Sequence, residues 1–242
     1  MSIMETRRRF RRTVLGPFWE AIGLGVLIGT LGLVYTGLWH TEIKIYLPFL
    51  CAGKLIWNAF SSIIHEGSGV FVQAGGVIRE MRIPFNIFVF NTVLRNLISM
   101  AHCSIIFIIV VLLFSVPVNL NTLLVIPGLI LFTINVGWIT LLIGMLCARF
   151  RDMQPMIVNL LQISFFLTPI VWMPENLSNP LYTVILIKIN PIFNLIDLVR
   201  SPLLGKAPAL ACWPYVICMA IIGWTCALGV FSHFRNRIIF WL

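Results

Sequence analysis

The residues of this sequence that could perform catalysis are few. There is no G-x-x-x-x-G-K-[ST] motif, so the chain does not bind ATP through a P-loop. There is also no H-E-x-x-H or G-x-S-x-G motif and no pair of carboxylates within the apolar segments, so the residue sets of common hydrolases are absent. The six cysteines form no C-x-x-C pair, and we interpret them as packing residues rather than as metal ligands or disulfides. We therefore predict that the chain is not an enzyme and that it holds no cofactor or metal.

Five arginines precede the first apolar segment, in the run RRRFRRTVLGPFW. Guanidinium groups bind phosphate through two parallel hydrogen bonds. Arg9, Arg11 and Arg12 are therefore candidates for a cytoplasmic gate that meets an anionic substrate, such as a lipid pyrophosphate. The alternative is that the run only anchors the chain by contacting anionic lipid headgroups.

Aromatic residues are frequent, with 18 Phe, 8 Trp and 4 Tyr, and several lie within apolar segments. In a pore, their ring faces could stack on the apolar C–H faces of sugars. The candidates for lining such a channel are Tyr35, Trp57, Phe166 and Trp172. The alternative roles are helix packing, lipid contact and interfacial belts. Lys54 also lies inside an apolar segment, where a charge must face a cavity or extend to an interface.

The composition indicates which elements position these residues. The chain has 242 residues, of which 60% are hydrophobic and 10% charged, whereas soluble domains average roughly half apolar and about a quarter charged. A helix that crosses a bilayer needs about 20 apolar residues. Apolar runs of this length lie near 21–39, 45–64, 95–116, 122–147, 155–173 and 213–233. We predict one all-α membrane domain over residues 1–242, with six transmembrane helices.

The Lys and Arg residues between the predicted helices orient the chain. Eleven of the 17 fall on the side of the N-terminus and four on the other side, and cytoplasmic loops are the ones enriched in these residues. We therefore predict that both termini, including residues 1–20, are cytoplasmic. The same distribution accounts for the net charge of +9 without a nucleic-acid partner.

Residues 67–84 lie on the predicted cytoplasmic side and have apolar residues at helical spacing until Pro84 ends the pattern. The pattern predicts a short amphipathic helix, although Gly75 and Gly76 weaken it. Such a helix either rests on lipid headgroups or docks into a cytoplasmic partner and transmits its movement. Periodicity alone favours neither interpretation.

Residues 174–206 lie on the predicted outer side and contain two apolar islands, LYTVILIKI and PIFNLIDLV, joined at Asn190 and Pro191. Each island is too short to cross a bilayer. A single crossing made from both would move the basic C-terminal end outside, so we predict a re-entrant or interfacial helical hairpin. The alternative is an ordinary extracellular loop.

Four segments, in order along the chain, carry a family resemblance. They are RFRRTVLGPFW (9–19), YLPFLCAGKLIWNAFSSIIHEG (46–67), RFRDMQPMIVNLLQISFFLTPIVW (149–172) and NPIFNLIDLVRSPLLG (190–205). Together they resemble the permease subunit of ATP-binding-cassette polysaccharide exporters, a type-2 exporter family that includes bacterial O-antigen, capsule and teichoic-acid exporters. Lys54 departs from the resemblance, because we expect an apolar residue at its position.

The resemblance implies a six-helix subunit that dimerises with a second copy of itself around a central channel. It also implies a separate nucleotide-binding partner subunit, which would hold the ATP and magnesium. A coupling helix would fall within 69–82, with Val70, Phe71, Arg79, Glu80 and Arg82 as the residues that meet the ATPase. The outer hairpin would form a gate containing Asn190, Pro191 and Arg200.

The function expected from this resemblance is ATP-driven export of a lipid-linked polysaccharide, of the O-antigen kind, across the bacterial inner membrane. The alternatives are export of teichoic acid, capsule or a small hydrophobic drug by the same fold. A nucleotide-independent channel or scaffold is a further alternative, from a different functional class.

Overall fold

The computed structural model describes residues 18–39, 42–80, 84–176, 179–235 and 237–241, and in these ranges the regular structure is helical, without strands. Five helices are long and apolar enough to cross a membrane. They are α2 (Phe18–Trp39), α3 (Ile43–Ser68), α6 (Asn86–Phe114), α7 (Val125–Arg149) and α11 (Cys212–Phe234). The prediction of an all-α, multi-pass membrane fold is confirmed.

The segment predicted as the fifth crossing, 155–173, is only partly helical. Helix α8 (Met153–Leu167) has 15 residues, and the backbone becomes extended at Thr168. The reason is Pro169, since the residue before a proline is sterically disfavoured in the helical conformation. With about 1.5 Å of rise per residue, α8 is about 22 Å long, which is less than the roughly 30 Å of a hydrocarbon core.

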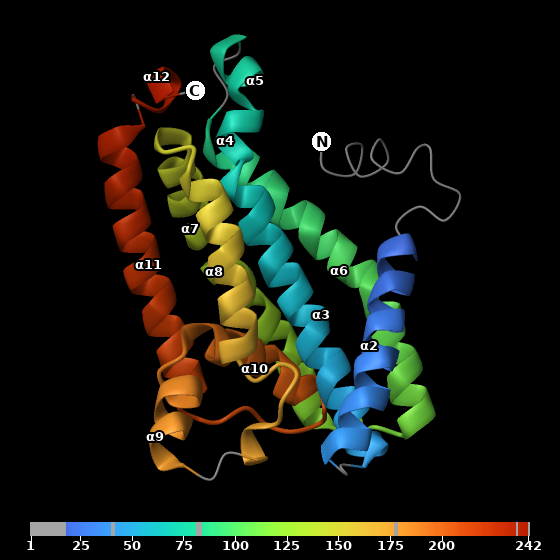
Figure 1. The fold of residues 1–242 in the computed structure, drawn as a ribbon. Coiled ribbons are helices and arrows are strands. Elements are labelled where there is room, and N and C mark those ends of the chain that lie inside the picture. Colours follow the sequence, from blue (N-terminus) through green and yellow to red (C-terminus); the bar gives the residue numbers. More distant parts are fainter. Residues whose placement is uncertain (1–17, 40–41, 81–83, 177–178, 236, 242) are drawn as a thin grey trace.

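Helices α2, α3, α6, α7, α8 and α11 run alternately between two ends of the molecule (Figure 1). At one end, called here the coupling end, lie α4 (Val70–Gln73), α5 (Gly75–Glu80) and α12 (Ile238–Trp241). At the other, called the hairpin end, lie α9 (Pro180–Thr183), the π-helical turn η3 (Val184–Lys188) and α10 (Pro191–Leu203). Short 3-10 turns, η1 (Leu120–Leu124) and η2 (Pro174–Asn176), precede α7 and α9.

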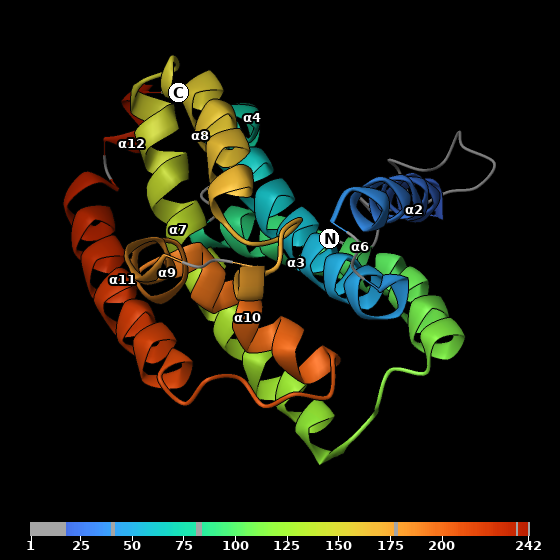
Figure 2. The ribbon, with the colours of Figure 1, turned by 60° about the horizontal axis from the view of Figure 1, so that its bottom comes forward.

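The predicted outer hairpin has two helical arms that meet at Asn190. The Asn190 side chain accepts hydrogen bonds from the backbone N–H groups of Ile192 (3.0 Å) and Phe193 (3.2 Å), and Pro191 follows as the first helical residue of α10. This is a standard helix N-cap, so the turn is specified locally. Viewed toward this end, α10 lies between α11 and α3 (Figure 2), and it contacts both of them and α7.

In place of the one amphipathic helix predicted within 67–84, the described residues form the end of α3 and two short helices. Helix α3 continues to Ser68, and the N–H of Gly69 closes it by bonding to the carbonyl oxygens of Glu66 and Gly67. Helices α4 and α5 then follow, with Ala74 between them. The backbone leaves regular helical geometry at Gly69 (φ −99°, ψ 0°) and again at Ala74 (φ −84°, ψ 0°), so one continuous helix does not form.

Helices α3 and α7 cross at two glycines near the coupling end. A Cβ on Gly67 would lie 2.4 Å from Thr140 Cγ2, and a Cβ on Gly144 would lie 2.8 Å from Val70 Cγ1 and 3.1 Å from Phe71 Cε2. Small residues let membrane helices approach this closely, where van der Waals packing holds them. The position of α4 is therefore fixed by its contact with α7.

This contact predicts that Gly144→Ala destabilises the protein, because the added methyl group must push Val70 aside. Overpacking of this kind costs about 1–3 kcal/mol. Thermal unfolding of the purified chain in detergent measures the effect, as a lower midpoint than that of the unchanged protein.

Gly229→Ala is the matched control, since Gly229 lies within α11 and its added methyl group would meet no atom within 4 Å. Alanine has the higher helix propensity, by about 1 kcal/mol, so this variant should unfold at the same temperature or slightly above it. Equal midpoints for the two variants would show that the crossing is not tightly packed.

Candidate functional site

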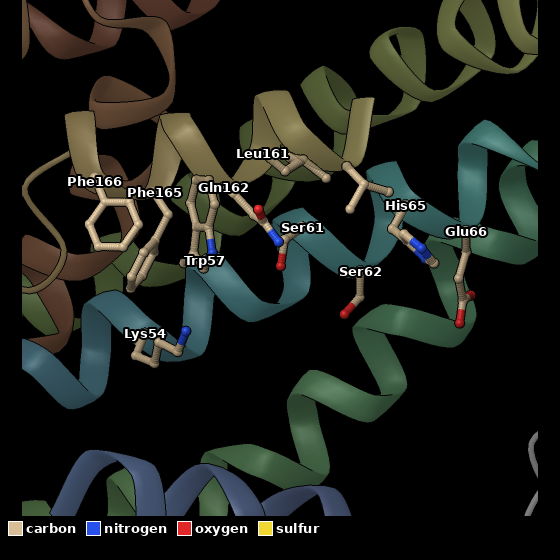
Figure 3. A pocket seen from close by; sticks show the side chains of 11 residues that line it. Lys54, Trp57, Ser61, Ser62, His65, Glu66, Leu161, Gln162, Phe165 and Phe166 are labelled. Carbon is tan, nitrogen blue, oxygen red and sulfur yellow. The ribbon is translucent and has the colours of Figure 1, made fainter. Parts of the chain in front are cut away.

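A cavity of about 610 Å³ lies between α3 and α8 and is called here the groove (Figure 3). The residues that α3 contributes recur every three or four positions, so they form one face of the helix. They are Lys54, Trp57, Ser61, Ser62, His65 and Glu66. Helix α8 contributes Val158, Leu161, Gln162, Phe165 and Phe166 from the opposite side. The groove is thus aromatic toward the hairpin end and more polar toward the coupling end.

Two of the predicted channel residues, Trp57 and Phe166, line this groove. Phe165 lies between them, with its ring centre 5.6 Å from that of Trp57 and 5.3 Å from that of Phe166. Trp57 is buried, whereas 73% of Phe166 is exposed, so Phe166 is the ring most open to a ligand. Phe165 was not selected from the sequence, and its position one residue before Phe166 was the available signal.

The other two predicted channel residues lie elsewhere. Tyr35 stacks on Tyr46, with ring centres 6.1 Å apart, and the Tyr46 hydroxyl donates a hydrogen bond to the carbonyl oxygen of Val171. The indole N–H of Trp172 donates to the carbonyl oxygen of Phe166 at 3.1 Å. Neither Tyr35 nor Trp172 lines the groove, although the hydrogen bond to Phe166 places Trp172 next to its α8 wall.

The side chain of Lys54 lines the groove, as expected for a charge that faces a cavity rather than the membrane–water interface. Its Nζ lies 4.4 Å from the centre of the Phe165 ring. This distance gives a cation–π interaction, in which the negative face of the ring stabilises the ammonium group. The groove therefore combines a cation, three aromatic rings and several hydrogen-bonding side chains.

A polar network joins the groove to α6 near the coupling end. Glu66 accepts hydrogen bonds from Arg95 (2.6 Å) and from the side-chain amide of Asn96 (2.8 Å). A smaller cavity of about 90 Å³ lies beside this network, and Glu20 on α2 lines it and accepts a hydrogen bond from Ser99. The network was not predicted. The feature of the sequence that could have indicated it is Glu66, which lies in the last turn of α3. A carboxylate is unfavourable there unless a cation offsets its charge.

Arg200, a predicted outer-gate residue, is an internal connector with 2% of its surface exposed. Its guanidinium group donates to the carbonyl oxygen of Pro169 (2.6 Å) and to Asp197 (2.9 Å), and it lies 4.3 Å from the centre of the Phe49 ring. One side chain thus links α10 to α3 and to the segment that follows α8.

Asn190, the second predicted gate residue, contacts the same segment. Its side-chain amide donates to the hydroxyl of Thr168 at 3.2 Å. Pro191 is exposed and makes no comparable contact in the described structure. Two side chains of the hairpin, Asn190 and Arg200, therefore form hydrogen bonds to the segment that directly follows α8.

The residues predicted to meet the ATPase divide into buried and exposed sets. Val70 and Phe71 are buried against α7, and Phe71 also contacts Phe85 edge to face. Arg79 and Glu80 are exposed. Other exposed side chains on the same two helices are Val72, Gln73 and Val77. Val70 and Phe71 therefore offer no free surface to a partner.

Some predicted residues lie outside the part of the chain that the structure describes. They are Arg9, Arg11, Arg12 and Arg82. Within the described ranges, no group of three or more His, Cys, Asp and Glu side chains is arranged to hold a metal ion.

Comparison with known proteins agrees with a membrane protein built of apolar helices. The chain is 21% identical over 192 residues to the O-antigen export system permease protein RfbA of Myxococcus xanthus, and the alignment covers 79% of this chain and 74% of that protein. The family model described as "ABC-2 type transporter" matches residues 1–204, which is most of the chain. By this match and by its helical membrane fold, the chain belongs to the ABC-2 type transporter family.

Proposed function

We propose that the chain is the permease subunit of an ATP-driven exporter that moves a lipid-linked polysaccharide, of the O-antigen kind, across the bacterial inner membrane. The observation that carries the proposal is the groove, where the rings of Trp57, Phe165 and Phe166 lie beside Ser61 and Gln162. Aromatic rings stack on the apolar faces of sugars, and the polar side chains can bond to sugar hydroxyls. Family membership and the similarity to RfbA support the same function.

The proposed topology has six crossings with both termini in the cytoplasm. Exposed arginines gather at the coupling end and support placing that end on the cytoplasmic side. They are Arg79, Arg149, Arg151, Arg235 and Arg237. Helix α8 is the remaining crossing, and the hairpin re-enters the membrane beyond its end. Non-helical backbone at that depth is tolerated where protein surrounds it.

The exposed side of α4 and α5 is the proposed contact with a separate ATPase subunit, which would hold ATP and magnesium. Val72, Val77 and Arg79 would touch that subunit. Val70 and Phe71, on the buried side, press against Gly144 of α7. A push on the exposed side would therefore reach α7 through packed side chains.

A second copy of the chain is the proposed other wall of the channel. Among the described residues, those of α3 and α8 wall the groove, and the outermost ring, Phe166, is 73% exposed. A homodimer that brings two such grooves together would enclose a polymer that one groove leaves open.

Reconstitution tests the proposed function directly. The chain and a cassette ATPase in lipid vesicles should move lipid-linked glycan when ATP is supplied, and should not do so with a non-hydrolysable analogue. Phe166→Ala should lower glycan-stimulated ATP turnover about two- to twelvefold, as expected for loss of about 0.5–1.5 kcal/mol of ring stacking.

Leu167→Ala is the matched control, because Leu167 is 50% exposed and does not line the groove. Its glycan-stimulated turnover should equal that of the unchanged protein. A reconstituted complex that neither moves glycan nor responds to it would refute the proposal and favour a scaffold or a drug exporter.

The coupling contact predicts that Arg79→Glu weakens association with the ATPase. Reversing a charge at the edge of an interface creates like-charge contacts, and a loss of about 1.4 kcal/mol corresponds to tenfold weaker binding. Copurification of the two subunits measures this loss. Lys188→Glu reverses an exposed charge at the hairpin end and should leave copurification intact. Equal copurification of both variants would place the ATPase elsewhere.

The gate assignment predicts that Arg200→Lys loosens the hairpin. Lysine keeps the charge but cannot reach Pro169 and Asp197 with one planar group, so about 1.5–3 kcal/mol of charge-assisted hydrogen bonding is lost. Hydrogen exchange of the α10 amides should speed up accordingly. Lys206→Arg, the reverse exchange at an exposed position, should leave it unchanged. Unaltered exchange in the Arg200 variant would contradict the connecting role.

A further inference from the structure

We propose that the glycan passing this groove is acidic and that Lys54 contacts its carboxylate or phosphate groups in turn. The inference rests on the proposed function and adds the chemical class of the cargo. It starts from the position of Lys54, the twelfth of the 26 residues of α3, about midway between the two ends of the molecule. Figure 3 shows its side chain at the aromatic part of the groove, near Phe165 and Trp57.

Other cations inside the helix bundle have acidic partners. Arg95 is paired with Glu66 at 2.6 Å, and Arg200 with Asp197 at 2.9 Å. Lys54 differs, because among the described residues no carboxylate lies within 4.0 Å of its ammonium group, and its contact is the ring of Phe165. The acid on the same face of α3, Glu66, is twelve residues away, which is about 18 Å along the helix.

A lysine without an acidic partner is costly within a membrane, and residues of this kind are kept for the path of an ion or substrate. An apolar side chain of similar length, such as methionine, would line the groove equally well without that cost. The retained charge is explained if the cargo brings negative groups into a space where water is scarce. Rings of Lys and Arg serve anion-conducting pores in the same way.

The form of the side chain suits a moving chain of anions. An ammonium group is a point charge on a flexible stem, and it does not require the paired geometry that arginine imposes on a carboxylate or phosphate. It can therefore release one anionic group and take the next. Between two such contacts the ammonium group can return to the ring of Phe165. It can leave the ring again, since a cation–π contact is weaker than an ion pair within the membrane.

The neighbouring side chains favour a sugar polymer as the source of these anions. Trp57 and Phe166 offer faces for sugar rings, and Ser61 and Gln162 offer hydrogen bonds to hydroxyls. A uronic acid or a phosphodiester-linked sugar combines both properties. The pyrophosphate of a lipid carrier has the same anionic chemistry, but it would pass once per molecule rather than repeatedly.

The first test measures the glycan and its export in cells. The surface glycan that disappears when the chain is deleted should contain uronic acid or phosphate by chemical assay. Export should fall about tenfold in Lys54→Met, as for loss of about 1.4 kcal/mol, and further in Lys54→Glu, and Lys54→Arg should keep most of it. Lys44→Met is the matched control on α3, where the lysine is exposed in the first turn and outside the groove, and should export normally.

The second test separates the polymer from its lipid carrier. The purified complex with its ATPase is given two probes, namely the isolated lipid-linked glycan and the same pyrophosphate lipid carrying one neutral sugar. Lys54→Met should weaken binding of the first about tenfold and change binding of the second less than about twofold. Rescue of the first by Lys54→Arg would show that the charge is responsible rather than the fold.

Three results would overturn the inference. They are a surface glycan without uronic acid or phosphate, equal export by Lys54→Glu and Lys54→Met, and equal loss of binding for the two probes. A deletion that leaves all surface glycans in place is different, because it would refute the proposed function itself. A neutral glycan that is lost on deletion would refute only the acidic cargo.

Discussion

The hydrocarbon core of a membrane offers no hydrogen-bond partners, so polar side chains between these helices are stabilised by partners within the protein. Arg200 finds the carbonyl oxygen of Pro169 and the carboxylate of Asp197. The buried amide of Asn135 on α7 donates to the carbonyl oxygen of Val216 on α11 at 3.3 Å. These contacts decide which helices are neighbours more specifically than apolar packing does, because lipid tails solvate apolar side chains equally well.

The long helices were predictable because an apolar run of sufficient length leaves little choice in a bilayer. The turn at Asn190 was predictable too, since its cap and proline act locally. The predicted end of the fifth crossing was wrong by several residues. The apolar composition continues past Thr168, whereas Pro169 ends α8.

The site was harder to predict because it depends on contacts between distant segments. Nothing near Val70 and Phe71 in the sequence indicates that Gly144 covers them, so their burial could not be inferred from periodicity. The predicted channel residues Trp57 and Phe166 line one groove, whereas Tyr35 and Trp172 are aromatic residues of the same kind and do not line it. Residue type identifies candidates, but only the packing of α3 on α8 selects among them.

The short length of α8 has a consequence for the lipid around it. A helix of about 22 Å beside neighbours that are long enough to span a core of roughly 30 Å creates hydrophobic mismatch, which a bilayer relieves by thinning locally. The thinnest part of the membrane would then lie along the wall of the groove itself. A polar molecule crossing there would traverse less hydrocarbon than one beside the five longer helices.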